Sequence, residues 1–315
     1  MNLIGKLQPV IILSAALFGL VLGRFTSLGT VSSVLIEIFL MLLLYILFLT
    51  VDLKQLKDAL RNVKYTTTSV IINFVITPLI AFALGKIFFS YSLQIRMGLI
   101  MLLVTPCTDW YLVFTGLAKG NVELNMSILP INLILQVVLM PAYLLMFLGK
   151  EIQMDVVSIL QSIIFVLLIP FVVALVTKQL IKNKDNIKDK ISEQSDNLQL
   201  VFLCIAVVVM FASEGNSLFE NPSLLYKMFV PLVIFFVLLF FISQIVGRIM
   251  KFNKRDIIAL NFTTLARNSP LALAIAAAAF PDMPMVSLAL VIGPLIELPI
   301  LSIISNILLK WNDEI

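Results

Sequence analysis

The stretch "LLVTPCTDWYLVFTGLAKGN", residues 102–121, places a proline, a cysteine and an aspartate inside a long apolar run. Pro106 lacks a backbone N–H and disfavours a helical conformation at Thr105, so the run is predicted to break there. A new half-helix is expected beyond the break, capped by Thr108 or Asp109. Interrupted helices are tolerated in hydrocarbon only where protein or a wet cavity satisfies the freed backbone groups. This break is therefore predicted to face the protein interior.

A second apolar run is interrupted at "ARNSPLALAIAAAAFPD", residues 266–282. Ser269 followed by Pro270 has the pattern of an N-cap and a first-position proline, which predicts that another half-helix begins there. Each interrupted run leads into a long apolar run that closes with a lysine, Lys150 in one case and Lys310 in the other. Paired interruptions at matching positions of two halves indicate the binding site of a secondary transporter.

The composition is that of an integral membrane protein. Of 315 residues, 61% are hydrophobic and 13% are charged, against about 45–50% and 25% in a typical soluble domain. A helix needs about 20 mainly apolar residues to cross the hydrocarbon. The apolar runs predict spans at about residues 7–24, 30–51, 65–89, 95–118, 122–148, 154–177, 198–213, 226–247, 256–280 and 284–309.

Ten such spans predict an all-α polytopic fold of two five-helix repeats, with the fourth and ninth spans broken. Because five is an odd number, the two repeats must enter the membrane in opposite directions, as inverted repeats do. No linker separates soluble-style domains. We therefore expect a single transmembrane domain over residues 1–315, with repeat one at about 1–150 and repeat two at about 151–315.

The distribution of basic residues predicts the orientation. The N-terminus, the even-numbered loops and the C-terminus together carry 16 lysines and arginines, whereas the opposite side carries 5. The positive-inside rule then puts both termini in the cytoplasm, for a multi-pass protein of the inner (plasma) membrane. Basic clusters next to a membrane usually meet anionic lipid headgroups. No basic patch with interleaved aromatic residues indicates nucleic-acid binding.

Four ionisable residues lie within the predicted spans: Glu37, Asp109, Arg267 and Glu297. A charge at the bilayer centre costs at least about 2.5–3.5 kcal/mol, so such residues generally have a partner or a function. Arg267 and Asp109 occupy the two breaks, where they could pair as a structural salt bridge, or Arg267 could contact a substrate directly. Histidine is absent, so proton chemistry would need carboxylates or the thiol.

Three motifs together resemble the bile acid/sodium symporter superfamily, particularly its arsenite efflux permease branch. They are "PCTDW" at 106–110 with "GLAKGN" at 116–121, "ARNSPLALAIAAAAFPD" at 266–282, and "GPLIELPIL" at 293–301. The resemblance implies a panel of four helices and a core whose broken helices cross. It also implies that Glu297 is the family acid and that Asn132 corresponds to an asparagine of the arsenite branch.

The ninth span departs from the arsenite permeases, which tend to carry two asparagines, an aromatic residue and a glutamate there. It is closer to the symporters' Gln-Asn-Ser-Gly stretch, but with Arg267 in place of the glutamine and Thr263 in place of an expected acid. Sodium needs converging oxygen ligands, so a guanidinium at this position argues against sodium coupling.

Trivalent arsenic is thiophilic, and a thiolate is its natural soft ligand. Cys107 is therefore the candidate metalloid ligand, although a cysteine inside a span can also be a packing residue. The predicted function is secondary active efflux of arsenite or antimonite coupled to the proton gradient, with Glu297 and Asp109 as coupling residues. The candidate substrate-binding residues are Cys107, Thr108, Asp109, Asn132, Arg267, Asn268 and Ser269.

The alternative is a transporter of small organic anions that uses Arg267 as a carboxylate receptor. In either case the expected partners are a small inorganic or organic solute, protons and membrane lipid, without a cofactor. An enzyme is not expected, because the chain has no histidine and no paired intramembrane acids at the spacing of hydrolases.

Overall fold

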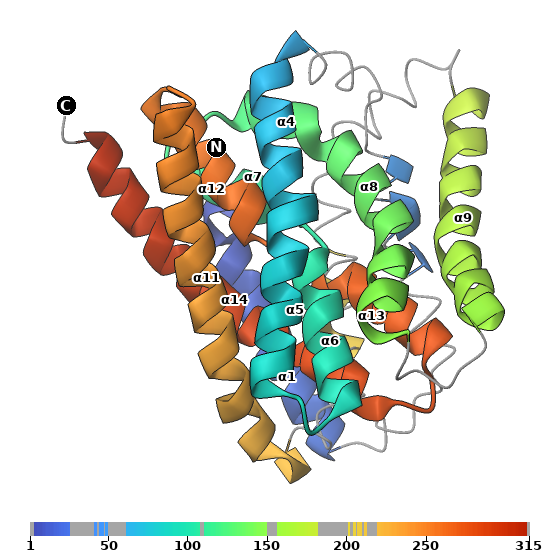
Figure 1. Ribbon diagram of the computed structural model, residues 1–315. Coiled ribbons are helices and arrows are strands. Elements are labelled where there is room, and N and C mark those ends of the chain that lie inside the picture. The colour runs from blue at the N-terminus through green and yellow to red at the C-terminus, as the bar shows by residue number, and fades with distance from the viewer. Residues whose placement is uncertain are drawn as a thin grey trace.

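The computed structural model describes residues 3–25, 61–107, 110–149, 156–181 and 219–313, together with a few positions in 41–49 and 201–212. Every named element in these ranges is a helix, and the helices pack into a bundle (Figure 1). This confirms the all-α prediction. The predicted spans at 30–51 and 198–213 fall largely outside the described residues, so the count of ten stays a prediction.

The first group of core helices begins with a long run that is continuous from Val63 to Phe88 but includes one π-helical segment. Two shorter helices follow, separated by the break at Pro106, and then another long helix. In chain order the group comprises α4 (Val63–Ile71), η2 (Ile72–Ile76), α5 (Thr77–Phe88), α6 (Leu93–Val104), α7 (Trp110–Leu117) and α8 (Val122–Leu148).

The second group repeats this order of long helix, short helix, break, short helix and long helix. It comprises α11 (Pro222–Ile249), α12 (Lys254–Leu265), α13 (Ser269–Ala279) and α14 (Pro284–Asp313). The two short helices before the breaks, α6 and α12, have 12 residues each. Outside the two groups lie α1 (Leu3–Phe25) and α9 (Val156–Leu180).

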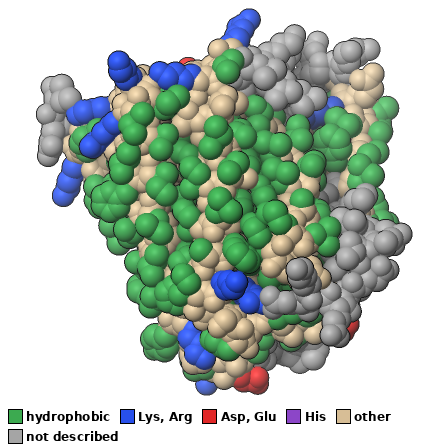
Figure 2. Space-filling view, viewed as in Figure 1, with side chains coloured by type: hydrophobic (Ala, Val, Ile, Leu, Met, Phe, Trp, Pro, Cys, Tyr) green, Lys and Arg blue, Asp and Glu red, His purple; other side chains and the backbone are tan. Residues whose placement is uncertain are grey.

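Four helical runs among the described residues are long and apolar enough to cross a membrane. They are Val63–Phe88, Val122–Leu148, Pro222–Ile249 and Pro284–Trp311. Their outward faces carry large apolar side chains such as Val75, Leu79 and Phe241, and hydrophobic side chains dominate the middle of the surface in Figure 2. An apolar outer face is what contact with lipid tails requires. The chain is therefore a membrane protein, as the composition predicted.

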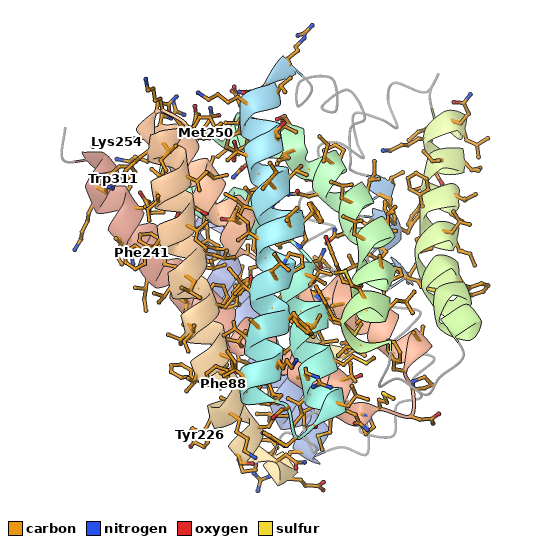
Figure 3. The ribbon with its side chains drawn as sticks, viewed as in Figure 1. Phe88, Tyr226, Phe241, Met250, Lys254 and Trp311 are labelled. Carbon is orange, nitrogen blue, oxygen red and sulfur yellow. The ribbon has the colours of Figure 1, made fainter. Side chains whose placement is uncertain are left out.

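The two ends of the bundle can be followed in Figure 3. Met250, Lys254 and Trp311 lie at one end, and Phe88 and Tyr226 lie at the other. The predicted orientation requires Met250, Lys254 and Trp311 to lie at one end, which it assigns to the cytoplasm, and Phe88 and Tyr226 to lie at the opposite end.

The end of the bundle near Lys254 is tied together by two asparagine caps. Asn121 caps α8 by accepting the backbone N–H of Leu124, and its side-chain amide donates to Asp256 Oδ1 at 2.7 Å. Asn253 caps α12 by accepting the backbone N–H of Asp256. The backbone N–H of Asn121 also donates to the carbonyl of Arg255 at 3.0 Å. These bonds hold the start of α8 against the start of α12, which fixes both helices relative to the breaks.

Candidate functional site

Both predicted breaks are present and buried. Helix α6 ends at Val104, and Thr105 is extended at φ −104° and ψ 97°, as a residue before proline should be. Helix α12 ends at Leu265, and Ala266 is extended at φ −70° and ψ 137°. Thr105 and Arg267 are at most 1% exposed. The prediction that the breaks face the protein interior is confirmed.

The two breaks cross and hydrogen bond to each other. Pro106 lies opposite Arg267 in an isolated antiparallel bridge. The backbone N–H of Cys107 donates to the carbonyl of Ala266 at 2.9 Å, and that of Asn268 donates to the carbonyl of Thr105 at 2.8 Å. Each break thus hydrogen bonds to backbone groups that have no helical partner in the other break. Unwound backbone is stable away from water only when its N–H and C=O groups are paired in this way. We call residues 105–107 and 266–268 the crossing.

The cap of the half-helix after the second break lies one residue before the predicted position. Helix α13 begins at Ser269, but its N-cap is Asn268, whose Oδ1 accepts the backbone N–H of Leu271 at 3.1 Å. The prediction that Ser269 is the cap was wrong. The asparagine just before it also has a capping side chain and reaches the N–H three residues later, and the Ser269 hydroxyl makes no hydrogen bond to a described residue.

Cys107 stands at the start of the other half-helix. Its Sγ accepts the backbone N–H of Trp110 at 3.3 Å, so the sulfur takes the place that a capping oxygen has in other helices. Cys107 is 2% exposed. Thr108 and Asp109, the predicted caps and candidate binding residues, lie outside the described residues. The predicted pairing of Asp109 with Arg267 therefore stays a prediction, as does any role of Glu37, which also lies outside them.

The Arg267 side chain hydrogen bonds to oxygens at the ends of two helices. Its Nε donates to the carbonyl of Leu265 at 3.2 Å, and its Nη1 donates to the carbonyl of Leu103 at 2.9 Å. Its Nη2 donates to the carbonyl of Thr264 and to Asn73 Oδ1, the latter at 3.1 Å. Four of the five N–H groups of a guanidinium are therefore used within the protein.

Glu297 of α14 reaches the crossing, as the family resemblance implied. Its Oε1 accepts the backbone N–H of Arg267 at 2.8 Å, and the residue is 3% exposed. This bond goes to the main chain of Arg267, whereas the guanidinium donates to carbonyl and amide oxygens. A buried carboxylate one hydrogen bond from the crossing could couple protonation to the conformation of the break.

Sequence reasoning missed Asn73, which is fully buried at the π-helical segment η2. Its amide donates to the carbonyl of Thr263 at 3.1 Å, while its Oδ1 accepts from Arg267. Tyr143 donates to the carbonyl of Phe74 in the same segment at 2.6 Å. A π-helical turn inside an α-helix is frequent at functional sites. The available signal was a single uncharged polar residue inside the apolar run "SVIINFVITPL".

Asn132 lies on the core face of α8 and contacts α12. Its amide donates to Thr263 Oγ1 at 3.2 Å, one helical turn before the crossing, and its Oδ1 has no hydrogen-bond partner among the described residues. Gln136, one turn further along α8, is fully buried, and neither end of its amide hydrogen bonds to a described residue. These buried polar groups are available for a polar solute or for water.

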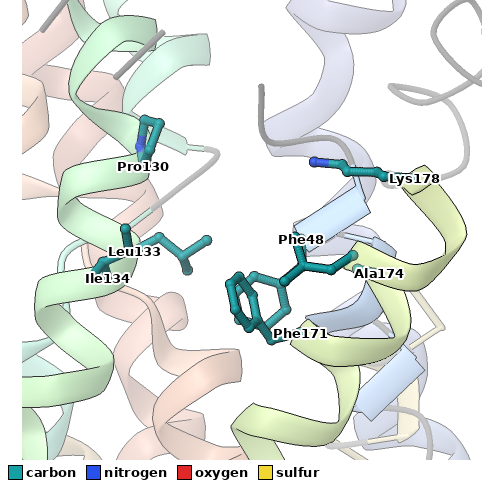
Figure 4. Close-up of a pocket in the computed structure, with 8 residues that line it drawn as sticks. Phe48, Pro130, Leu133, Ile134, Phe171, Ala174 and Lys178 are labelled. Atoms are coloured by element: carbon teal, nitrogen blue, oxygen red, sulfur yellow. The ribbon is translucent and has the colours of Figure 1, made fainter. Parts of the chain in front are cut away.

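A cavity of about 50 Å³ lies between α8, α9 and the described positions near residue 48, and neither Asn132 nor Gln136 lines it. Figure 4 shows the rings of Phe48 and Phe171 facing Leu133 and Ile134 across it, with Lys178 at one edge. Its lining is otherwise apolar and comprises Phe48, Pro130, Leu133, Ile134, Phe171, Ala174, Leu175 and Lys178. Among the described residues, no group of three or more His, Cys, Asp or Glu side chains could hold a metal ion.

Crossed broken helices with a buried acid agree with the family that the motifs resemble. The family described as "Sodium Bile acid symporter family" matches residues 37–221. The chain belongs to this family. Members of the sodium bile acid symporter family are transporters, so the chain is a membrane transporter and the classification as a non-enzyme agrees with its relatives.

Two curated relatives of the chain are arsenical-resistance proteins. The chain is 28% identical to Arsenical-resistance protein Acr3 of Corynebacterium glutamicum, over 95% of this chain and 87% of the relative. It is 21% identical to Arsenical-resistance protein Acr3 of Alkaliphilus metalliredigens, over 90% of this chain and 84% of the relative. A third relative, the uncharacterized sodium-dependent transporter YocS of Bacillus subtilis, is 30% identical over 52% of this chain and 51% of its own length.

Proposed function

We propose that this transporter exports arsenite and antimonite and is driven by the proton gradient. The observation that carries the proposal is the position of Cys107. It is a buried soft ligand at the crossing, and its Sγ accepts the backbone N–H of the first residue of the half-helix α7. The chain is similar to arsenical-resistance proteins over nearly its whole length.

The chemistry of the solute fits the groups at the crossing. Arsenite near neutral pH is mostly a small neutral trihydroxide, whose arsenic prefers sulfur and whose hydroxyl groups both donate and accept hydrogen bonds. Cys107 would bind the arsenic, and Asn132, Asn268 and Ser269 would offer polar atoms to the hydroxyl groups. One thiolate binds more weakly than three, which suits a carrier that must release its cargo. Thr108 and Asp109 are proposed to complete the site.

Glu297 is the proposed coupling residue, with Asp109 as a second carboxylate. The Glu297 carboxylate accepts the Arg267 backbone N–H at 2.8 Å. Protonation would remove its negative charge and so would weaken this hydrogen bond to residues 266–268 of the crossing. Charged hydrogen bonds are about twice as strong as neutral ones. A proton could thereby bias the crossing between two conformations.

The architecture that we propose for this function is a single domain of ten spans in two inverted repeats, about residues 1–150 and 151–315. The repeated order of long helix, short helix, break, short helix and long helix supports it. We further propose that the protein resides in the inner (plasma) membrane with both termini in the cytoplasm, on the strength of the charge asymmetry.

The rival proposal, an organic-anion carrier with Arg267 as carboxylate receptor, has less support. Four guanidinium N–H groups already donate to protein oxygens, and the residue is 1% exposed. A substrate carboxylate would have to displace these bonds in order to form a bidentate pair.

Transport by Cys107→Ser in everted membrane vesicles tests the proposal. Serine is nearly isosteric and is itself a good N-cap, so it should keep the bond to the Trp110 N–H while removing the soft ligand. We expect wild-type vesicles to accumulate arsenite when a proton gradient is imposed, with or without sodium, and the Ser variant to accumulate none. Cys204→Ser is the matched control, because Cys204 is the only other cysteine in the chain and should be dispensable.

Full arsenite accumulation by Cys107→Ser, measured at equal protein level, would rule out the thiolate role. Loss of wild-type accumulation on removal of sodium alone would contradict proton coupling. If organic acids inhibited the wild type and antimonite did not, the organic-anion carrier would become the better proposal.

A further inference from the structure

The guanidinium of Arg267 occupies a cage of oxygen atoms. Three of its acceptors are backbone carbonyls, of Leu103, Thr264 and Leu265, and the fourth is the amide oxygen of Asn73. The Phe235 ring centroid lies 5.5 Å from the central carbon of the guanidinium. A cation here is surrounded by oxygen atoms and an aromatic face and is almost completely shielded from solvent.

The carbonyls of the cage are those that a helix leaves unsatisfied at its C-terminus. In α12, the last four carbonyls accept from the Ala266 N–H, from Asn73, and twice from the Arg267 side chain. In α6, the Thr105 hydroxyl lies within bonding distance of two of the last four carbonyls, and Arg267 donates to a third. One arginine therefore completes the ends of both interrupted helices.

The backbone contributes counter-charge to this arginine, in addition to the nearby carboxylate of Glu297. A helix C-terminus carries roughly −0.5 of an elementary charge, and two such ends point at the guanidinium, so together they offset roughly one positive charge. The Glu297 carboxylate bonds to the main-chain N–H. The site is therefore one for a monovalent cation, built from two helix C-termini and an amide oxygen.

Secondary transporters coordinate coupling cations such as sodium with unwound backbone carbonyls and the C-terminal ends of half-helices. The same kinds of ligand meet here, in a family named for sodium symport. We propose that the Arg267 side chain is a tethered cation that permanently occupies a monovalent-cation site at the crossing, and that its removal leaves a site that binds sodium.

This inference deepens the sodium-independent coupling proposed above, and it does not depend on which solute is carried. A covalently attached cation cannot leave the site. It therefore stabilises the crossing but cannot couple transport to a sodium gradient. The remaining ionisable group that bonds to the crossing among the described residues, Glu297, is then left to respond to protons.

The test measures thermal stability of the purified full-length protein in sodium chloride and in choline chloride. Wild type should melt at the same temperature in both salts. Arg267→Ala and Arg267→Gln should melt lower than wild type in choline, because buried carbonyls lose their donors. Sodium should raise their melting temperatures by roughly 3 °C at a concentration about ten times Kd. Potassium, which is larger, should raise them less.

Two control variants separate this effect from a general response to salt. Arg96→Ala removes another buried arginine, on α6 but outside the crossing, and should show no difference between sodium and choline. Arg267→Lys keeps a tethered cation and should also be insensitive to sodium.

Equal melting of Arg267→Ala and Arg267→Gln in the two salts would overturn the proposal, as would sodium stabilisation of wild type. If neither neutral variant could be purified even in sodium while Arg267→Lys could, the result would count against a sodium site as well. The readout uses no arsenite, so a wrong assignment of the solute would leave this test intact.

Discussion

Replacing Glu297 with glutamine measures how the buried Arg267 charge is compensated. If the two helix ends neutralise the guanidinium, the carboxylate contributes mainly its bond to the Arg267 backbone N–H, 2.8 Å long. Hydrogen bonds to charged groups contribute about 1.5–3 kcal/mol and neutral ones about 0.5–1.5 kcal/mol. Because glutamine retains an acceptor oxygen, Glu297→Gln should cost about 1 kcal/mol, which lowers the melting temperature by about 2–4 °C.

The competing view is that Glu297 is the essential counter-ion of Arg267. Removing one partner of a buried ion pair costs about 3–5 kcal/mol, so Glu297→Gln would then lower the melting temperature by roughly 10 °C. Thermal melts of the detergent-solubilised protein distinguish the two values. A loss of 3 kcal/mol or more, or a protein that does not fold, would refute the argument that the helix ends balance the charge.

Glu297→Ala is the matched comparison. It removes the acceptor as well as the charge and leaves a buried backbone N–H without its partner, which costs about 1–3 kcal/mol more than the glutamine variant. In vesicles, Glu297→Gln should still exchange arsenite in counterflow but should lose net accumulation driven by a proton gradient. Retained proton-driven accumulation would place the coupling group elsewhere.

Asn268→Ala should destabilise the protein by about 0.5–2 kcal/mol because it removes the N-cap of α13, whereas Ser269→Ala should change stability little; the reverse order in thermal melts would restore the serine as the cap. Gln136→Met should leave the melting temperature unchanged or higher, because the amide is fully buried without a described partner, and a clear drop would show that the amide is bonded in the folded protein. Reporter fusions after residue 190 should behave as cytoplasmic and those after residue 152 as external; the opposite pattern would invert the proposed topology.

The sequence alone was sufficient for features that depend on local chemistry. Composition identified a membrane protein, because a helix that crosses the hydrocarbon needs a long run of apolar residues. Pro106 and Pro270 located both breaks, since a proline restricts the residue before it and suits the first turn of a helix. The cap of α13 was misplaced by one residue because Asn268 and Ser269 are adjacent and both have capping side chains, so their local signals compete.

The environment of Arg267 was decided only by the tertiary structure. Its acceptors come from α6, from η2 and from the end of α12, and Asn73 is 194 positions away in the chain. The sequence offered Asp109 as a partner of Arg267, and that pairing stays a prediction. Residue types reveal charges but not helix dipoles that converge from distant segments, so the carbonyl ligands could not be predicted. The crossing of the two broken helices decides which backbone carbonyls lack an N–H donor from their own helix. It also decides the direction in which these carbonyls point. Composition and motifs therefore identify a membrane transporter, whereas the cation site at its centre exists only once the two halves of the chain have packed together.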